Sequence, residues 1–296
     1  MSDKIKQRAV IALGYFDSVH IGHQKVIEKA KETAQKLNAI TVVFTFRGNL
    51  RATLSGGHDS VVYTASEREN IIKGLGVEQV FFAPTSRKFL SLGKLAFLNY
   101  LNKIFNVVCY VSGEDYKFGK MGKGNVDYIK KYAYLHGQKS ITVDTLNFES
   151  GKISTTAIKG LLKDGNVEKA NALLGRSYSV SGVVFSDRKV GRSLGFPTIN
   201  LNVEQEKQRL KFGVYAGSVA LNGVKHKALI NYGARPTFDL DKPLIEAHIL
   251  DFSGELYGQT VTVEFEKFVR EVIKFESAEQ LKAQITKDIE RVKNYD

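Results

Sequence analysis

Strand-like and helix-like segments alternate through the first half of the chain. Short β-branched and aromatic runs predict strands, whereas longer segments with one apolar face predict helices. The predicted strands cover residues 9–13, 40–46, 80–83 and 107–112, and the predicted helices cover residues 20–37, 66–75 and 95–104. This alternation predicts a parallel sheet with helices on both faces. Ligands of such sheets bind at the carboxyl ends of the strands.

The second half changes to short alternating segments that are separated by turns. Two short helices come first, at residues 156–163 and 167–174, with Asn166 as cap and Gly175 as stop of the second. The predicted strands then cover residues 178–185, 214–221, 225–231, 245–252 and 260–269, with an Asn222-Gly223 hairpin turn. Ser277 and Gln280 form a capping box that opens a final helix. The pattern predicts a small antiparallel barrel or sandwich, with a domain boundary near residue 180.

Composition narrows the class of protein. The 296 residues, 43% hydrophobic and 25% charged, suit two globular domains. Cys109 is the single cysteine, which excludes an intramolecular disulfide and a CxxC metal site and favours a reducing compartment. The sequence has no signal-like segment and no apolar run near the ~18 residues that cross a membrane. We therefore expect a soluble cytoplasmic protein without a membrane partner.

The net charge of +12 is unevenly distributed. Residues 1–180 hold 26 Lys and Arg against 15 Asp and Glu, whereas residues 181–296 hold 17 against 16. A positive field over one domain attracts polyanions, which include ATP, pyrophosphate and nucleic acid alike. The charge therefore indicates a class of ligand without choosing among its members.

Two histidines mark a candidate phosphate site in the first domain. The segment 14–23 follows the first predicted strand and opens a helix, and His20 and His23 face the same side of its first turn. Unsatisfied amides and the helix dipole favour a phosphate there, and imidazoles can donate hydrogen bonds to its oxygens. Gly22 has no side chain, so a nucleotide can lie close to the backbone at this turn. An HxxH pair alone is more often a pair of surface histidines. A zinc site is less favoured, because nothing supplies the remaining ligands at the usual spacing. The position of the pair directly after the first predicted strand favours a nucleotide site.

A second candidate site lies in the second domain. Alternation along the segment 191–200 places Thr198 and Asn200 on one face, where a hydroxyl and an amide can hold Mg²⁺ and a phosphate oxygen. In isolation this pair is more often a solvated strand face. Glu246 alternates with apolar residues in its strand, and the usual fate of such a residue is a solvent-exposed carboxylate.

These segments resemble the bacterial bifunctional riboflavin kinase/FAD synthetase family over nearly the whole chain. The matching motifs are residues 14–23, 113–119 (Gly-Glu-Asp-Tyr-Lys-Phe-Gly), 153–159 (Ile-Ser-Thr-Thr-Ala-Ile-Lys), 191–200 (Gly-Arg-Ser-Leu-Gly-Phe-Pro-Thr-Ile-Asn), 213–216, 231–238, 251–258 and 270–275. The resemblance implies a Rossmann-like FMN adenylyltransferase domain, a nucleotidyltransferase, at residues 1–180. It implies a riboflavin kinase domain, an antiparallel β-barrel with a terminal helix, at residues 181–296.

The resemblance also implies two reactions and their residues. The second domain would convert riboflavin and ATP to FMN and ADP, and the first would convert FMN and ATP to FAD and pyrophosphate, with Mg²⁺ accompanying ATP. The residues implied in the first domain are catalytic His20 and His23, phosphate-binding Gly14, Phe16, Asp17, Gly22, Ser154, Thr155, Thr156 and Lys159, and flavin-binding Asp115. Those implied in the second are phosphate-binding Gly191, Arg192, Thr198 and Asn200, the last two also as Mg²⁺ ligands, the catalytic base Glu246, and flavin-binding Tyr215, Phe238 and Arg270.

The chain departs from the family pattern at several single positions and in one loop, and Tyr232 stands where the family usually has Ile. Ser18 and Asp187 stand where the family usually has Gly, and Lys159 stands where it has Arg. Residues 47–50 read Arg-Gly-Asn-Leu instead of Asp-Pro-His-Pro, in a loop implied to help hold FMN. Lys cannot reproduce the bidentate fork of Arg on phosphate, and a carboxylate repels phosphates unless a cation compensates.

Three functions therefore remain open. The first is the bifunctional enzyme. The second is a kinase whose first domain only binds nucleotide or supports the fold, which the departures in that domain motivate. The third is a flavin-responsive regulator that binds RNA through the basic domain. Because the sequence has no recognised RNA-binding signature, we do not expect nucleic acid as a partner.

Overall fold

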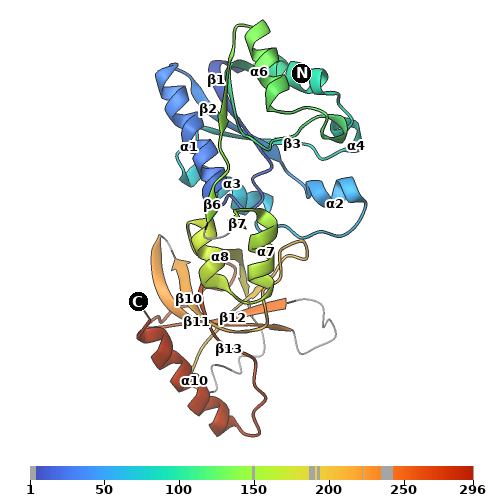
Figure 1. Cartoon of the computed structure of the whole chain (residues 1–296). Helices are drawn as coiled ribbons and strands as arrows, with labels where there is room; N and C mark the ends of the chain where they lie inside the picture. Colours follow the sequence, from blue (N-terminus) through green and yellow to red (C-terminus); the bar gives the residue numbers. More distant parts are fainter. Residues whose placement is uncertain are drawn as a thin grey trace. The chain divides into compact units, whose positions relative to one another are not determined.

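The computed structural model describes residues 5–148, 151–186, 191, 194–221, 223–234 and 243–295. Its contacts divide the chain into two compact units, Met1–Thr155 and Thr156–Asp296 (Figure 1). The division falls before α8 (Val167–Leu174), whose buried residues pack against strands of the second unit. The expected boundary near residue 180 leaves this helix in the first domain, whereas its contacts place it with the second.

The described part of the first unit contains a five-stranded parallel sheet in the order β3-β2-β1-β4-β5. Its strands are β1 (Ile5–Leu13), β2 (Ile40–Phe46), β3 (Gln79–Ala83), β4 (Phe105–Gly113) and β5 (Lys139–Val143). The first four were predicted nearly in place, because each is a compact β-branched or aromatic run. Only β5, which is short and begins with Lys139 and Ser140, was not predicted.

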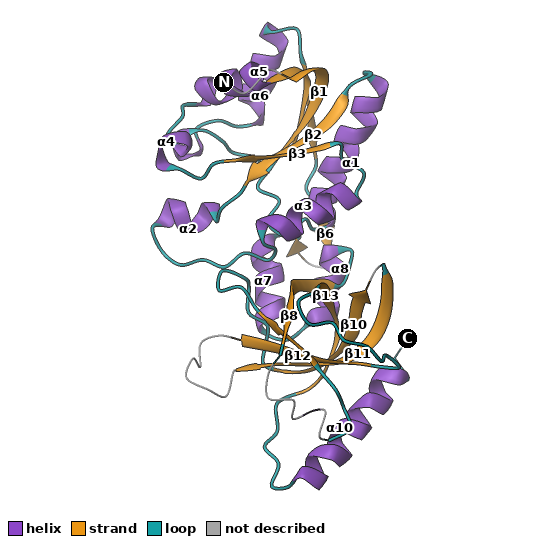
Figure 2. Ribbon diagram, turned by 180° about the vertical axis from the view of Figure 1, so that it is seen from behind, coloured by secondary structure: helices purple, strands orange, loops and turns teal. Residues whose placement is uncertain are grey.

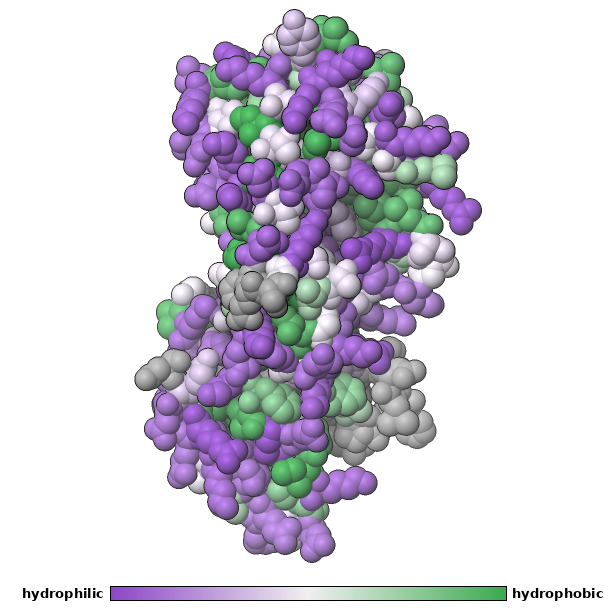
Figure 3. Space-filling view, viewed as in Figure 1, coloured by the Kyte–Doolittle hydropathy of each residue, from purple (hydrophilic) through white to green (hydrophobic). Residues whose placement is uncertain are grey.

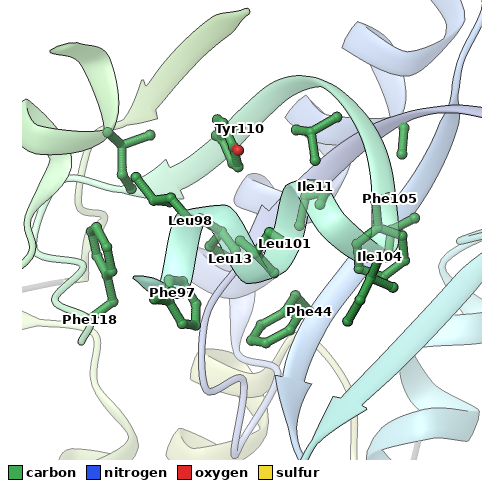
Figure 4. Close-up of a cluster of buried hydrophobic side chains, with 14 of the residues drawn as sticks. Ile11, Leu13, Phe44, Phe97, Leu98, Leu101, Ile104, Phe105, Tyr110 and Phe118 are labelled. Atoms are coloured by element: carbon green, nitrogen blue, oxygen red, sulfur yellow. The ribbon is translucent and has the colours of Figure 1, made fainter. Parts of the chain in front are cut away.

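Alternation along β1 supplies two hydrophobic cores, one on each face of the sheet. Ile11 and Leu13 point into the core under α5 (Lys94–Ile104) and α6 (Val126–Leu135), which Figure 4 shows. Val10 and Ala12 point into the core under α1 (Ile21–Lys36) and α3 (Ala65–Gly74). Figure 2 shows α1 on one side of the strands and α5 with α6 on the other. The predicted layering is confirmed.

Several shorter elements complete this unit. They are α2 (Leu50–Ser55), α4 (Arg87–Leu90), the 3₁₀ turn η1 (Lys120–Gly122), β6 (Asn147–Phe148), β7 (Gly151–Lys152) and the start of α7 (Thr155–Lys163). The sequence analysis did not predict α2, nor any of the elements from η1 to β7. On the face that Figure 3 shows, hydrophobic side chains gather on the side of the unit that carries α2 and α4.

The second unit is built on a closed antiparallel barrel, with strand order β10-β11-β12-β9-β8-β13 among the described residues. Its strands are β8 (Tyr178–Phe185), β9 (Ile199–Asn202), β10 (Gly213–Leu221), β11 (Val224–Ala234), β12 (Pro243–Ile249) and β13 (Thr260–Arg270). The barrel alternative is thus confirmed. β12 ends before the predicted residue 252, because the chain turns at Asp251, whose φ is 53°.

The terminal helix α10 (Ala278–Lys293) covers one outer face of the barrel. Ser277 caps it, as predicted, by accepting a hydrogen bond from the backbone amide of Gln280. The reciprocal bond of the predicted capping box is shifted, because the Gln280 side chain accepts from the Glu276 amide and not from that of Ser277. Ile285, Ile289 and Val292 pack against barrel residues such as Leu229. In the parts of the chain that the structure describes, no helix combines the length and apolarity needed to span a membrane.

Candidate functional sites

A cavity of about 540 Å³ opens at the carboxyl end of the parallel sheet. The last residues of four strands line it, namely Leu13, Phe46, Gly113 and Val143. The sheet order reverses between β1 and β4, so the cavity lies at the switch point where such sheets bind ligands. Predicted site residues that line it are Gly14, Phe16, His20, Gly22, His23, Asp115, Ser154 and Thr155.

The two histidines are stacked at the start of α1. Their ring centroids lie 3.6 Å apart with the planes 10° from parallel. The backbone N–H of His23 donates to Nδ1 of His20 at 3.1 Å, so His20 is also the helix cap. Because Nδ1 accepts, the neutral His20 ring carries its proton on Nε2, which is the ring nitrogen that can donate.

The loop that carries His20 has a strained backbone. Phe16 and Val19 have φ values of 51° and 43°, in the left-handed region that residues with a Cβ rarely adopt. The Gln24 side chain holds the loop by donating to the Val19 carbonyl at 2.8 Å. Such strain costs on the order of 1–3 kcal/mol per residue and gathers at functional sites.

Gly14 and Asp17 shape this loop in different ways. A Cβ on Gly14 would lie 2.6 Å from the Phe16 ring, so only glycine allows the ring to fold back here. Asp17 is 1% exposed, and its carboxylate accepts a hydrogen bond from the Val62 amide at 3.0 Å. Asp17 does not line the cavity. Its hydrogen bond to Val62 fixes the loop, and its predicted phosphate contact stays a prediction.

Ser18 and Thr155 connect the loop to the segment after β7. Their hydroxyl oxygens lie 3.0 Å apart, and Ser18 is fully buried. Thr155 begins α7, and Thr156 and Lys159 lie further along this helix in the second unit. Their predicted phosphate contacts stay predictions.

Asp115 lies at the rim of the cavity and forms an ion pair with Lys152 at 2.7 Å. Both side chains are at least half exposed, so the pair contributes little to stability. The neighbouring Glu114 accepts a hydrogen bond from the Thr145 amide at 3.1 Å, and this bonding with Thr145 lowers the pKa of Glu114.

The sequence analysis missed an aromatic wall in the cavity. The wall is formed by Phe46, Phe89, Phe97, Tyr116 and Phe118, with Leu50, Arg51 and Leu54 of α2 beside it. An apolar wall of aromatic side chains suits an aromatic ring system. Its members come from four separate segments, so no spacing in the sequence signals them. Only Tyr116 and Phe118 lie within a motif that the sequence analysis recognised.

A buried arginine organises the strand ends at this cavity and was also missed. Arg68 of α3 is 1% exposed and donates to the carbonyls of Tyr15 at 3.1 Å and Phe46 at 2.8 Å. The Tyr15 hydroxyl in turn accepts from the Leu50 amide at 3.2 Å. Burial raises the pKa of Tyr15 to about 12, so the hydroxyl stays protonated at neutral pH. This hydrogen bond anchors the segment 47–50, which departs from the family pattern, to the loop that carries His20.

In the second unit, three polar side chains form a row across neighbouring strands. Glu246 of β12 is paired directly with Asn200 of β9 on one side and with Asn231 of β11 on the other. The Asn231 side chain donates to Oε2 of Glu246 at 2.9 Å. Directly paired residues of antiparallel strands share a face, so the three side chains project together. Asn231 was not among the predicted site residues, because its alignment with Glu246 depends on strand register.

Two cavities meet at Thr198. The smaller, about 280 Å³, is lined by Thr198 and Asn200 together with the turn 252–257. The larger, about 400 Å³, is lined by Thr198, Glu246 and Arg270. Its apolar residues are Leu194, Phe196, Val214, Leu229, Val272, Ile273, Phe275, Leu281 and Ile285. The predicted trio of Thr198, Asn200 and Glu246 is therefore brought together where the two cavities meet, and the larger cavity is largely apolar.

The amide oxygen of Asn200 fits a metal-bound role. Asn200 is 6% exposed, and its Oδ1 is buried without a hydrogen-bond partner among the described residues. An unsatisfied buried acceptor is costly, and a hard cation such as Mg²⁺ is the kind of partner that satisfies it. The donor set of an amide oxygen and the Thr198 hydroxyl therefore suits the Mg²⁺ that accompanies ATP.

Arg270 enters the larger cavity from the end of β13. Its Nε donates to the carboxylate of Asp288 at 2.8 Å, and Asp288 is fully buried on α10. Gln284 donates to the other oxygen of Asp288 at 2.9 Å. The terminal helix thus orients the guanidinium beside the apolar lining.

Other predicted residues of this unit have different outcomes. Tyr215 is fully buried in the barrel interior and donates to the Lys211 carbonyl, so the structure places it in the core instead of in either cavity. Gly191 lines the larger cavity, where a Cβ would lie 2.4 Å from the Phe196 carbonyl oxygen. Arg192 and Phe238, like the departure at Asp187, lie outside the described residues.

Comparison with known proteins assigns each half of the chain. A family profile described as FAD synthetase matches residues 2–157, and one described as riboflavin kinase matches residues 174–296. The interval between the two matches contains all but the last residue of α8, the helix on which the predicted and structural boundaries differ.

Relatives match along nearly the whole length. The bifunctional riboflavin kinase/FMN adenylyltransferase of Listeria monocytogenes is 37% identical, covering 94% of this chain and 90% of that one. The protein of the same name from Bacillus subtilis is 34% identical, covering 97% and 92%. A crystal structure from Streptococcus pneumoniae, solved under the name macrolide-efflux protein, is 33% identical with a TM-score of 0.89, covering 99% and 96%. The chain therefore belongs to the bifunctional riboflavin kinase/FMN adenylyltransferase family.

Proposed function

We propose that the second unit transfers the γ-phosphoryl group of ATP to riboflavin at the junction around Thr198. The observation that carries this proposal is the meeting of two compartments beside Glu246. The larger, apolar compartment suits the isoalloxazine ring, with Arg270 beside it, and the smaller one, into which Thr198 and Asn200 bring polar groups, suits the phosphates. The reacting hydroxyl and phosphate then meet where the Asn200–Glu246 row crosses the barrel face.

Glu246 acts as the general base in this proposal. It removes the proton of the ribityl 5′-hydroxyl while that oxygen attacks the γ-phosphorus, and ADP leaves. Asn231 holds the carboxylate in place through the 2.9 Å hydrogen bond. Thr198 and Asn200 would hold Mg²⁺, which offsets phosphate charge when it is bound with ATP.

The cavity of the first unit carries the second reaction. A phosphate oxygen of FMN attacks the α-phosphorus of ATP, FAD forms, and pyrophosphate leaves. His20 donates from Nε2 to phosphoryl oxygens, and His23 stacks against it at the positive end of α1. The aromatic wall holds the flavin ring. This chemistry requires positioning and charge neutralisation, with no protein nucleophile.

Chromatography of one reaction tests both activities. Purified protein with riboflavin and Mg²⁺-ATP is expected to accumulate FMN and then FAD, and supplied FMN is expected to yield FAD directly. Glu246→Gln should slow the first conversion by about 100-fold or more and leave the second intact. FMN without FAD in both reactions would establish the kinase-only alternative, and no product at all would contradict the proposal.

The substrates also bear on location and partners. ATP and free flavins are cytoplasmic metabolites, and the single buried cysteine suits a reducing compartment. We therefore place the enzyme in the cytoplasm, with ATP, riboflavin and FMN as its partners. The positive charge of the first domain serves ATP and pyrophosphate in this account. Salt-dependent binding to structured RNA at low ionic strength would instead support the regulator alternative.

A further inference from the structure

We propose that Ser18 is a positioning residue for adenylyl transfer, acting through the hydroxyl of Thr155. This inference rests on the proposed function of the first unit. Ser18 lies between Phe16 and Val19, the two strained residues of the loop that carries His20, and Thr155 lies at the start of α7. Their hydroxyls are 3.0 Å apart. The bond joins the two segments that line the phosphate side of the cavity.

Burial makes this hydrogen bond effective. Ser18 is fully buried, whereas Thr155 is partly exposed and lines the cavity. A hydrogen bond to the buried Ser18 hydroxyl restricts the rotation of both side chains, and it is stronger on the side that is shielded from water. Thr155 is therefore held in one orientation toward the space beside His20 and His23. Ser18 itself does not line the cavity, so its effect on ATP passes through Thr155.

The backbone accommodates a serine at this position without strain. Phe16 and Val19 have positive φ values, but Ser18 is not among the described residues that do. Glycine is therefore not required by backbone conformation at residue 18. The serine adds a tether that a glycine would lack, and this distinguishes the loop from the usual family pattern.

A double-mutant cycle tests the tether. The variants are Ser18→Ala, Thr155→Val and the double variant, assayed for FAD formation from FMN and ATP. Loss of one hydrogen bond predicts a roughly three- to tenfold fall in kcat/KM for ATP in Ser18→Ala. The KM for FMN and the riboflavin kinase activity of the same preparation should not change. In the Thr155→Val background, Ser18→Ala should have no further effect.

A matched control is available in the same unit. Thr64 and Ser66 form another hydroxyl pair, 3.1 Å apart, and neither lines the cavity. Ser66→Ala should therefore leave the kcat/KM for ATP unchanged. An equal effect of Ser18→Ala in both Thr155 backgrounds, or a matching rise in the KM for FMN, would overturn the proposal.

Calorimetry separates this proposal from the assignment of activity. ATP binding is measured in an Asn200→Ala background, in which the nucleotide site of the second unit is weakened. If the parent protein makes no FAD, the proposed function fails, but the affinity comparison still decides the role of Ser18. A three- to tenfold weaker ATP affinity in Ser18→Ala, absent in the Thr155→Val background, supports the tether. Equal affinities reject it.

Discussion

Asn200 and Glu246 are direct partners across the β9–β12 pair, so a candidate metal ligand lies beside a candidate base. Their side chains share a face, because opposed residues of antiparallel strands project to the same side. The row continues to Asn231, which holds Glu246 at 2.9 Å. Strand register therefore places a candidate metal ligand, a candidate base and the residue that holds the base side by side.

Glu246→Gln should lower the kcat for riboflavin phosphorylation by about 100-fold or more, because the amide cannot accept the proton. FAD formation from supplied FMN should be unaffected. The measurement is steady-state kinetics of both reactions on one preparation. Glu290→Gln, on the exposed side of α10, is the charge-matched control and should retain full kinase activity. A Glu246→Gln enzyme with wild-type kcat would remove the base from the mechanism.

Asn200→Ala should weaken Mg²⁺-ATP binding in the kinase reaction by at least about tenfold, or 1.4 kcal/mol. Its free energy of unfolding should stay within about 1 kcal/mol of that of the parent protein, because Oδ1 has no hydrogen-bond partner among the described residues. A Mg²⁺ titration of activity and a urea melt measure the two quantities. Loss of stability with unchanged Mg²⁺ dependence would show that the amide is structural.

Asp288→Ala should destabilise the second unit by about 3 kcal/mol, because it leaves the Arg270 guanidinium without its buried partner. The KM for riboflavin should rise as Arg270 loses its orientation. Asp288→Asn keeps an acceptor for Nε and should have a smaller effect on both. Urea unfolding and riboflavin kinetics provide the measurements, and an unchanged KM in a destabilised Asp288→Ala would separate the helix contact from flavin binding.

Cys109 should resist alkylation in the native protein. It is fully buried in β4, and burial raises the pKa of its thiol to about 11. At pH 8 only about one thiol in a thousand is then ionised, and the thiolate is the reactive form. Labelling with iodoacetamide should be slow at pH 8, rise with pH toward 11, and become complete in urea. Rapid labelling at pH 8 without denaturant would show that β4 opens readily.

The sequence by itself determined most of the helices and strands, and the motifs at residues 14–23 and 191–200 that mark the two candidate sites. Alternation in β1 and the apolar face of α10 arise from side-chain periodicity, which is a local property. The caps at Asn166 and Ser277 likewise depend on the few residues around them. Resemblance supplied the chemistry of His20 and Glu246, although it did not show what holds either side chain.

The tertiary structure alone decided which distant residues meet. The aromatic wall, the hold of Arg68 on the strand ends and the Ser18–Thr155 bond each join segments that are far apart in sequence. Tyr215 lies within a matching motif but packs in the core, because alternation along β10 turns it inward. Periodicity shows that successive side chains of a strand point to opposite faces. Closure of the barrel and the register of its strands decide which residues each face packs against.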